Sequence, residues 1–139
     1  IIKIQMHTFF LILAFLAIFF GMEFIYLTLS MSFYRTKYAR VQNIQVDKMK
    51  PFKFWPIGLI AYIVLAVAIW FLVIHKTKTY VEIISKATIL ALAIYGTFNF
   101  TNFVIFEGYD MELVIRDTLW GVFVVNLASI LTFVLSKSL

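Results

Sequence analysis

Six polar or ionisable side chains stand inside long apolar stretches of this sequence, where such residues are energetically costly. They are Glu23, Tyr62, Asn99, Asn102, Asp117 and Trp120. A carboxylate or amide at membrane depth usually faces the interior of a helix bundle and marks a functional site. Carboxylates, amides, a phenol and an indole can satisfy one another through hydrogen bonds. The same set of groups could also bind a proton or a small solute.

Spacing along the chain predicts which of these side chains share a helix face. Asn99 and Asn102 are three residues apart, and Trp120 follows Asp117 at the same spacing, which places each pair on one side of a helix. Gly121 lies one turn after Asp117, and a small residue at this position lets another helix approach closely. We therefore expect the six side chains to converge in one half of a helix bundle.

Two interpretations of this predicted polar cluster remain open. In the first, the cluster is a buried hydrogen-bond network that fixes the register of the helices, with each bond contributing about 0.6 kcal/mol. In the second, Glu23 and Asp117 take up and release protons or contact a transported solute, as intramembrane carboxylates of transporters do.

Four apolar stretches of the length of a membrane span must position these side chains. They cover residues 8–29, 55–74, 87–106 and 113–135. A helix needs about 20 mostly apolar residues to cross about 30 Å of hydrocarbon, and backbone groups in lipid must be bonded internally. We predict an all-α protein with one transmembrane domain over residues 1–139. Its architecture would be an antiparallel up-down four-helix bundle in a multi-pass integral membrane protein.

Composition supports this class and argues against several functions. Hydrophobic residues make up 63% of the 139 residues and charged residues 14%, well below the roughly 25% charged residues of a soluble domain. The mean hydropathy is +0.98. The sequence has no cysteine, no HExxH spacing and no phosphate-binding glycine loop. We therefore expect no enzymatic activity, no cofactor, no metal site and no nucleic-acid partner.

The loops carry charge of opposite sign. The loop between the first two stretches has one acid, Asp47, against six basic residues: Arg35, Lys37, Arg40, Lys48, Lys50 and Lys53. The loop before the last stretch is acidic, with Glu107, Asp110 and Glu112. The predicted order places both loops at the same end of the bundle. They could therefore attract each other, or each could simply be solvated.

The basic loop also has a helical pattern. Tyr34, Tyr38 and Val41 recur at helical spacing with basic residues between them. We expect an extension of the first helix that lies at the level of the lipid headgroups, where aromatic rings anchor and basic side chains reach water. Anionic lipid is a possible partner of this loop, because each basic residue near the surface contributes about 1 kcal/mol of attraction.

Two runs of residues resemble the signature of a known family. Tyr95–Asn102 has the sequence YGTFNFTN, and Arg116–Gly121 has the sequence RDTLWG. They are similar to the motifs Tyr-x-Thr-Tyr-Asp-Leu-Thr-Asn and Asp-x-x-Trp-Gly of a family of small, mainly bacterial, four-pass membrane proteins of unknown function. Glu23–Leu27 resembles the Asp-x-x-Trp-Leu of that family's first helix. The resemblance covers nearly the whole chain and implies the fold and a membrane location, but no activity.

The chain departs from the family pattern at positions that matter for chemistry. Asn99 stands where the family motif has an acid, and Tyr26 and Phe98 replace a tryptophan and a tyrosine. The loss of that acid weakens any proton relay that the resemblance would imply. The strongest matched positions are Asp117, Trp120 and Asn102.

Two classes of function follow from these observations. The first is a structural or accessory component of a membrane assembly, such as a membrane-lined virus particle or an organelle complex. The second is a small-solute or proton-coupled transporter or channel subunit that uses the polar cluster. Four helices rarely enclose a solute path alone, so the second class requires a homo-oligomer. The expected partners are the lipid bilayer and either other membrane proteins or further copies of the chain.

Overall fold

A computed structural model of the protein describes residues 2–48 and 55–138, and most of these residues are helical, with no strand among them. The elements in chain order are α1 (Ile2–Val41), the 3-10 turn η1 (Val46–Lys48), α2 (Trp55–Ile69), the π-helical turn η2 (Trp70–Ile74), α3 (Tyr80–Ala91), a second π-helical turn η3 (Leu92–Gly96), α4 (Thr97–Ile105) and α5 (Met111–Ser138). The predicted all-α class is confirmed.

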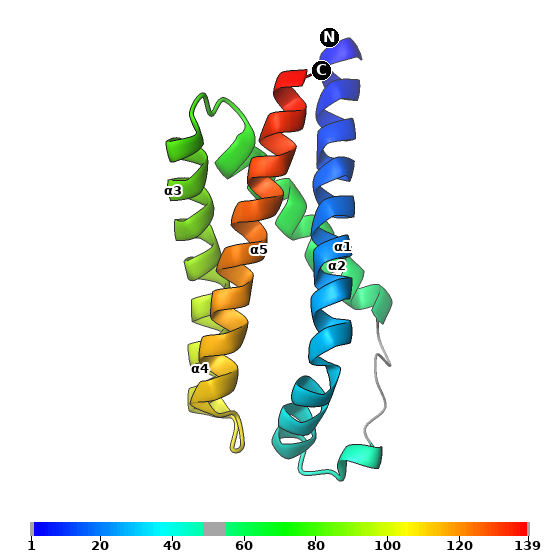
Figure 1. The fold of residues 1–139 in the computed structure, drawn as a ribbon, viewed down its shortest axis with the longest axis vertical. Coiled ribbons are helices and arrows are strands. Elements are labelled where there is room, and N and C mark those ends of the chain that lie inside the picture. Colours follow the sequence, from blue (N-terminus) through cyan, green and yellow to red (C-terminus); the bar gives the residue numbers. More distant parts are fainter. Residues whose placement is uncertain (1, 49–54, 139) are drawn as a thin grey trace.

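The helices lie alongside one another in a bundle (Figure 1). α5 packs against both α1 and the continuous helix formed by α3, η3 and α4. Both chain ends and the connection between α2 and α3 lie at one end of the bundle, which we call the terminal end. The loop between α4 and α5 and the last turns of α1 lie at the opposite end, which we call the loop end. The antiparallel up-down arrangement of the four segments across a bilayer remains a prediction.

Three helices are long and apolar enough to cross a membrane: Met6–Val41, Tyr80–Ile105 and Met111–Ser138. The second predicted span corresponds to a shorter apolar helix, Gly58–Ile74, so the expectation of four full-length spans holds for three of them in the described residues. The third span begins earlier than predicted because Thr79 caps α3. Its side-chain oxygen accepts a hydrogen bond from the backbone N–H of Glu82 at 3.2 Å.

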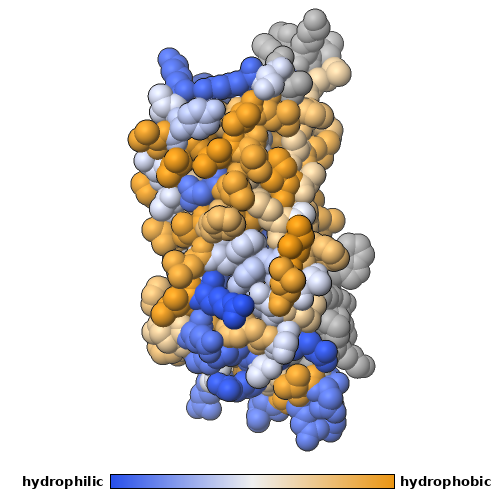
Figure 2. Space-filling model, in the orientation of Figure 1, coloured by the Kyte–Doolittle hydropathy of each residue, from blue (hydrophilic) through white to orange (hydrophobic). Residues whose placement is uncertain are grey.

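Apolar side chains cover the middle of the outer surface. Figure 2 shows a broad hydrophobic band between more hydrophilic ends on the face in view. Phe24, Leu29 and Val104 are among the most exposed large side chains, at 74%, 82% and 82% exposure. A continuous exposed apolar band of this extent would be a liability in water, whereas lipid chains match it. The protein is therefore a membrane protein by its surface as well as by its sequence.

The core differs in character along the bundle. Toward the terminal end, Leu11, Phe15 and Phe19 of α1 pack with small residues of α3 and α5, among them Ala87 and Ala128. Such small residues let membrane helices approach closely. At the loop end a second core cluster contains the buried residues Tyr34, Tyr109, Leu113 and Val114. Among their buried residues, the second cluster therefore includes phenols and the first does not.

The predicted extension of the first helix exists, and two of its side chains face the bundle. α1 continues without a break to Val41, and Tyr34 is 6% exposed and Lys37 is 8% exposed. Both side chains contact α5 or the loop before it, and the position of the extension at the level of the lipid headgroups stays a prediction. The basic residues Lys50 and Lys53 lie outside the described residues.

Candidate functional site

Asn99 and Asp117 form the centre of the polar cluster. The Asn99 side chain is fully buried, and its Nδ2 donates hydrogen bonds to Asp117 Oδ2 at 2.9 Å and to Thr118 Oγ1 at 3.2 Å. The Tyr109 hydroxyl donates to Asn99 Oδ1. Both N–H groups and the carbonyl of this amide therefore have partners, which fixes the orientation of the side chain.

A chain of hydrogen bonds connects Asp117 to its own neighbour, Arg116, by way of α1. Tyr34 donates to Asp117 Oδ1 at 3.2 Å, the hydroxyl oxygens of Tyr26 and Tyr34 are 3.1 Å apart, and Arg116 Nε donates to the Tyr26 hydroxyl at 3.3 Å. A guanidinium can only donate and each phenol has one hydrogen. The bonds must therefore all point the same way, from Arg116 through the two phenols to the carboxylate.

The second carboxylate of the cluster joins this chain through an indole. Trp120 Nε1 donates to Glu23 Oε1 at 2.9 Å. The Trp120 ring also stacks on the Tyr26 ring, with the ring centres 3.9 Å apart and an angle of 8° between the planes. Glu23 is 7% exposed, and this is its one hydrogen bond to a side chain within the described part of the protein. α1 and α5 are therefore joined by side-chain hydrogen bonds at two levels of the bundle, Glu23–Trp120 and Tyr34–Asp117.

Two of the predicted members lie at the edge of the network. Tyr62 is half-buried and its ring packs on Phe19 and Phe20, with centres 5.6 Å and 4.7 Å apart. Its hydroxyl has no hydrogen bond to another described residue. Asn102 is half-buried, and its side chain lies within hydrogen-bond reach of Tyr109, the phenol that bonds Asn99. The network therefore takes its members from α1, α4, α5 and the α4–α5 loop.

An ion cluster closes the loop end beside this network. Lys37 Nζ lies 2.6 Å from Asp110 Oδ2 and also bonds Glu112, and Arg40 Nη1 lies 3.2 Å from the same Asp110 oxygen. The hydrogen bond from Lys37, assisted by the backbone N–H of Leu113, holds the pKa of Asp110 below its usual value. The basic and acidic segments therefore attract each other, which was one of the two outcomes that the sequence allowed.

Gly121 and a nearby π-helical turn position the amide and the carboxylate. The ring of Tyr95, the residue before the end of η3, covers Gly121 so closely that a Cβ atom there would lie 2.2 Å from the ring Cγ. The predicted close approach at Gly121 is thus made by an aromatic ring. Tyr95 lies in the π-helical turn that joins α3 to α4. In α4, which follows this turn, Asn99 faces α5.

The sequence interpretation missed the phenols of the network. Tyr26 and Tyr34 were interpreted as a family substitution and an interfacial anchor, and Tyr109 was not singled out. A signal was present: Tyr26, Ser30 and Tyr34 follow one another at intervals of four residues, which places three hydroxyls on one face of a helix. Arg116 Nη2 donates to Ser30 Oγ at 3.3 Å, so the whole stripe faces α5.

No group of three or more potential metal ligands occurs in the described ranges. The sequence comparison gives one family: the model of the family described as "Predicted membrane protein (DUF2177)" matches residues 8–134. No curated protein and no solved structure matches the chain. The family match confirms the resemblance inferred from the motifs, and with it the membrane location.

Proposed function

We propose, from the premise that this chain belongs to the family of predicted membrane proteins designated DUF2177, that it is a structural or accessory component of a membrane assembly. The observation that carries the proposal is that the polar centre is hydrogen-bonded within the chain. Asn99 uses both donors and its acceptor within the chain, and Asp117 accepts a bond on each oxygen. A binding site for a transported solute needs polar groups that are available to the solute, and the bonds of these two residues are already made.

The outer surface supports the same proposal. Large apolar side chains face outward along the bundle, including Phe24 at 74% exposure and Phe98 at 54% exposure. In lipid, helices associate through packing of such surfaces and through bonds between polar groups, without a hydrophobic driving force. An accessory subunit would use this surface to contact the helices of its partners.

A second candidate is a proton-coupled transporter or channel subunit, and Glu23 favours it. This carboxylate is almost fully buried and has one side-chain hydrogen bond, from Trp120. A buried carboxylate with spare acceptor capacity is the kind of group that proton relays in membrane proteins use. The candidate requires a homo-oligomer, because a bundle of this size does not enclose a path by itself.

Reconstitution in liposomes distinguishes the two candidates. Wild type, Asp117→Asn and Glu23→Gln are compared for uptake driven by a pH gradient, with Asp47→Asn as a control in an exposed turn. We expect all four proteins to be folded and none to support uptake. Uptake by wild type and Asp47→Asn that Glu23→Gln or Asp117→Asn abolishes would overturn the structural proposal in favour of transport.

Purification in a gentle detergent tests whether the protein has a partner, as the proposal requires. An accessory subunit should be recovered with the same partner protein in independent preparations at a fixed ratio. Phe24→Ala on the outward face of α1 changes the exposed band, and Ser138→Ala at the end of α5 is a control outside it. Loss of a partner from the first variant only would support a role for this surface, and a protein that purifies alone in every preparation would contradict the proposal.

A further inference from the structure

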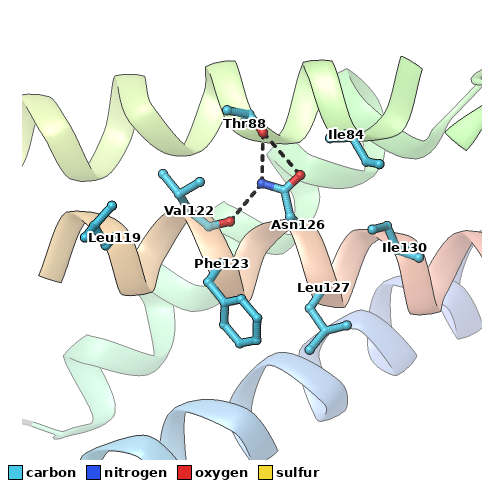
Figure 3. Close-up of a pocket in the computed structure, with 8 residues that line it drawn as sticks. All are labelled: Ile84, Thr88, Leu119, Val122, Phe123, Asn126, Leu127 and Ile130. Atoms are coloured by element: carbon cyan, nitrogen blue, oxygen red, sulfur yellow. Dashed lines mark hydrogen bonds between the residues drawn. The ribbon is translucent and has the colours of Figure 1, made fainter. Parts of the chain in front are cut away.

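An open apolar groove of ≈ 470 Å³ runs between α3 and α5 on the outer surface of the bundle (Figure 3). Ile84 of α3 and Leu119 and Phe123 of α5 line it, and these side chains are 45%, 65% and 54% exposed. The volume lies within the range of about 300–1,000 Å³ that small ligands occupy in proteins. The groove is thus large enough for a ligand and faces the region that lipid chains fill.

The polar groups within the groove are already bonded. Asn126 Nδ2 donates to Thr88 Oγ1 at 3.1 Å and to the Val122 carbonyl at 2.8 Å, and the two side chains point toward each other in Figure 3. Both amide hydrogens are therefore used within the protein. A ligand in this part of the groove needs only apolar surface.

A lysine stands at the terminal end of the same helix face. Counting from Asn126, every seventh or eleventh residue of α5 returns to nearly the same side, which brings Phe133 and Lys137 into line with the groove. Lys137 Nζ lies 4.2 Å from the centre of the Phe133 ring and 5.0 Å from that of the Tyr80 ring. The two rings attract the ammonium group but take none of its three N–H donors. Those donors remain available to an anion.

The charge around this lysine is positive. The described residues of the terminal end include four lysines, namely Lys76, Lys78, Lys86 and Lys137, against the single acid Glu82. Glu82 Oε1 is engaged by Lys86 at 2.6 Å, on a different side of α3 from Ile84. Lys137 thus has no carboxylate partner within the described part of the chain, and the surroundings favour an anionic ligand.

The distance along α5 between Asn126 in the groove and Lys137 matches the thickness of the hydrocarbon of one bilayer leaflet. Eleven residues of helix separate Asn126 from Lys137, which is about 16 Å, or about half of the 30 Å hydrocarbon core. We propose that this groove binds one anionic phospholipid of the leaflet at the terminal end. An acyl chain lies between α3 and α5, and the phosphate accepts hydrogen bonds from Lys137.

Lipid retention tests this assignment. The protein is reconstituted in vesicles of equimolar phosphatidylglycerol and phosphatidylcholine, extracted in mild detergent, and its retained lipids are quantified by mass spectrometry. Wild type should retain phosphatidylglycerol in excess. Lys137→Gln should reduce that excess about fivefold, the factor that one surface lysine supplies. Lys78→Gln removes the same charge at the same end of the bundle and should keep the excess.

A second pair of variants tests the groove itself. Ile84→Trp fills the groove and should lower retention of both lipids. Ile89→Trp places the same ring on a different, exposed face of the same helix and should leave lipid retention as in wild type. Equal excess in wild type and Lys137→Gln would overturn the proposal. The proposal also fails if Ile84→Trp leaves lipid retention unchanged and instead converts an oligomer to a monomer on sizing, because the groove would then accept a second copy of the chain.

Discussion

Along α5, the half near the loop end contacts its neighbours through a network of polar side chains, whereas the half near the terminal end contacts them mainly through apolar ones, with a single polar pair, Asn126 and Thr88, among the described residues. Asp117 and Trp120 bond to α1 and α4. One to three turns later, Val124, Val125 and Ala128 are fully buried among apolar neighbours. A single helix is therefore positioned by directional bonds in one half and by shape in the other.

The difference shows what each half can determine. Apolar packing between membrane helices depends on volume, and several rotations of a helix can satisfy it. A carboxylate that must form hydrogen bonds with both an amide and a phenol allows only one rotation of its helix about the helix axis. The loop-end half therefore fixes how α5 is turned relative to α1, and the terminal-end half determines how closely α3 and α5 approach.

The strongest test of this comparison is whether the two ends lie on opposite sides of a membrane. The protein has no cysteine, so single cysteines at Gln45, Glu107 and Lys78 can be labelled by an impermeant reagent in oriented vesicles. We expect Gln45 and Glu107 to react from one side and Lys78 from the other, in an all-or-none pattern. Labelling of Gln45 and Glu107 from opposite sides would refute the four-pass arrangement.

Truncation of the central carboxylate should have the largest effect on stability. Asp117→Ala leaves the Asn99 amide and the Tyr34 hydroxyl without their acceptor, at about 1–3 kcal/mol for each unpaired group. Asp117→Asn should cost much less. The new amide can accept from Asn99 and donate to Tyr34, whose hydroxyl then turns to donate to Tyr26, so that only the Tyr26 hydrogen must find a new acceptor. Thermal unfolding in detergent measures both variants, and similar losses from the two would show that the network does not behave as described.

Addition of one methyl group at Gly121 should have the next largest effect. A Cβ atom at this position meets the Tyr95 ring at 2.2 Å, and overpacking of this kind costs about 1–3 kcal/mol. Gly21 provides the matched control, because a Cβ there meets nothing within 4 Å. Gly21→Ala should be neutral or stabilising by up to about 1 kcal/mol, since alanine is the better helix former. A stability loss from Gly21→Ala equal to that from Gly121→Ala would argue against this contact.

The ion cluster should have the smallest effect, and acid should remove it. Lys37 holds the pKa of Asp110 below its usual value, so the folded protein binds this proton less readily than the unfolded chain does. The pair therefore stabilises the fold above the ordinary carboxyl pKa of about 3.9, and the stabilisation is lost as pH falls through the lower folded-state value. The contribution is below about 1 kcal/mol because the pair is partly exposed.

Melting temperatures over the acidic range test this dependence. Asp110→Asn should remove the acid-dependent part of the stability, whereas Glu107→Gln, an exposed residue of the same loop, should leave the curve as in wild type. If Asp110→Asn and wild type lose stability in parallel on acidification, the Lys37–Asp110 pair is not the cause.

Hydropathy was sufficient to predict the helical class and the three long apolar helices, because a span requires a long run of apolar residues whatever it packs against. Within the site, Asp117 and Asn99 could be singled out because polar groups are costly in lipid. The side chains that form hydrogen bonds with these two residues could not be predicted. Tyrosine is enriched at membrane surfaces, so its presence does not indicate the interior of a bundle, and only the rotation of α1 places Tyr34 against α5. Tyr62 shows the converse: its ring packs in the core against Phe19, but its depth along the helix did not show that its hydroxyl would lie outside the hydrogen-bond network.

The π-helical turn at Leu92–Gly96 divides the third span into a part that can lose a residue and a part that cannot. A π-helical turn holds one residue more than an α-helical turn would. Deletion of a single residue within 92–96 should therefore restore a regular α-helix and leave Asn99 facing Asp117. Deletion of Thr97 or Phe98, in the regular α-helix that follows, should instead rotate the preceding helix relative to Asn99 by about 100° and separate Asn99 from Asp117. The length of α4, and not only its composition, is part of what the protein must preserve through insertions and deletions.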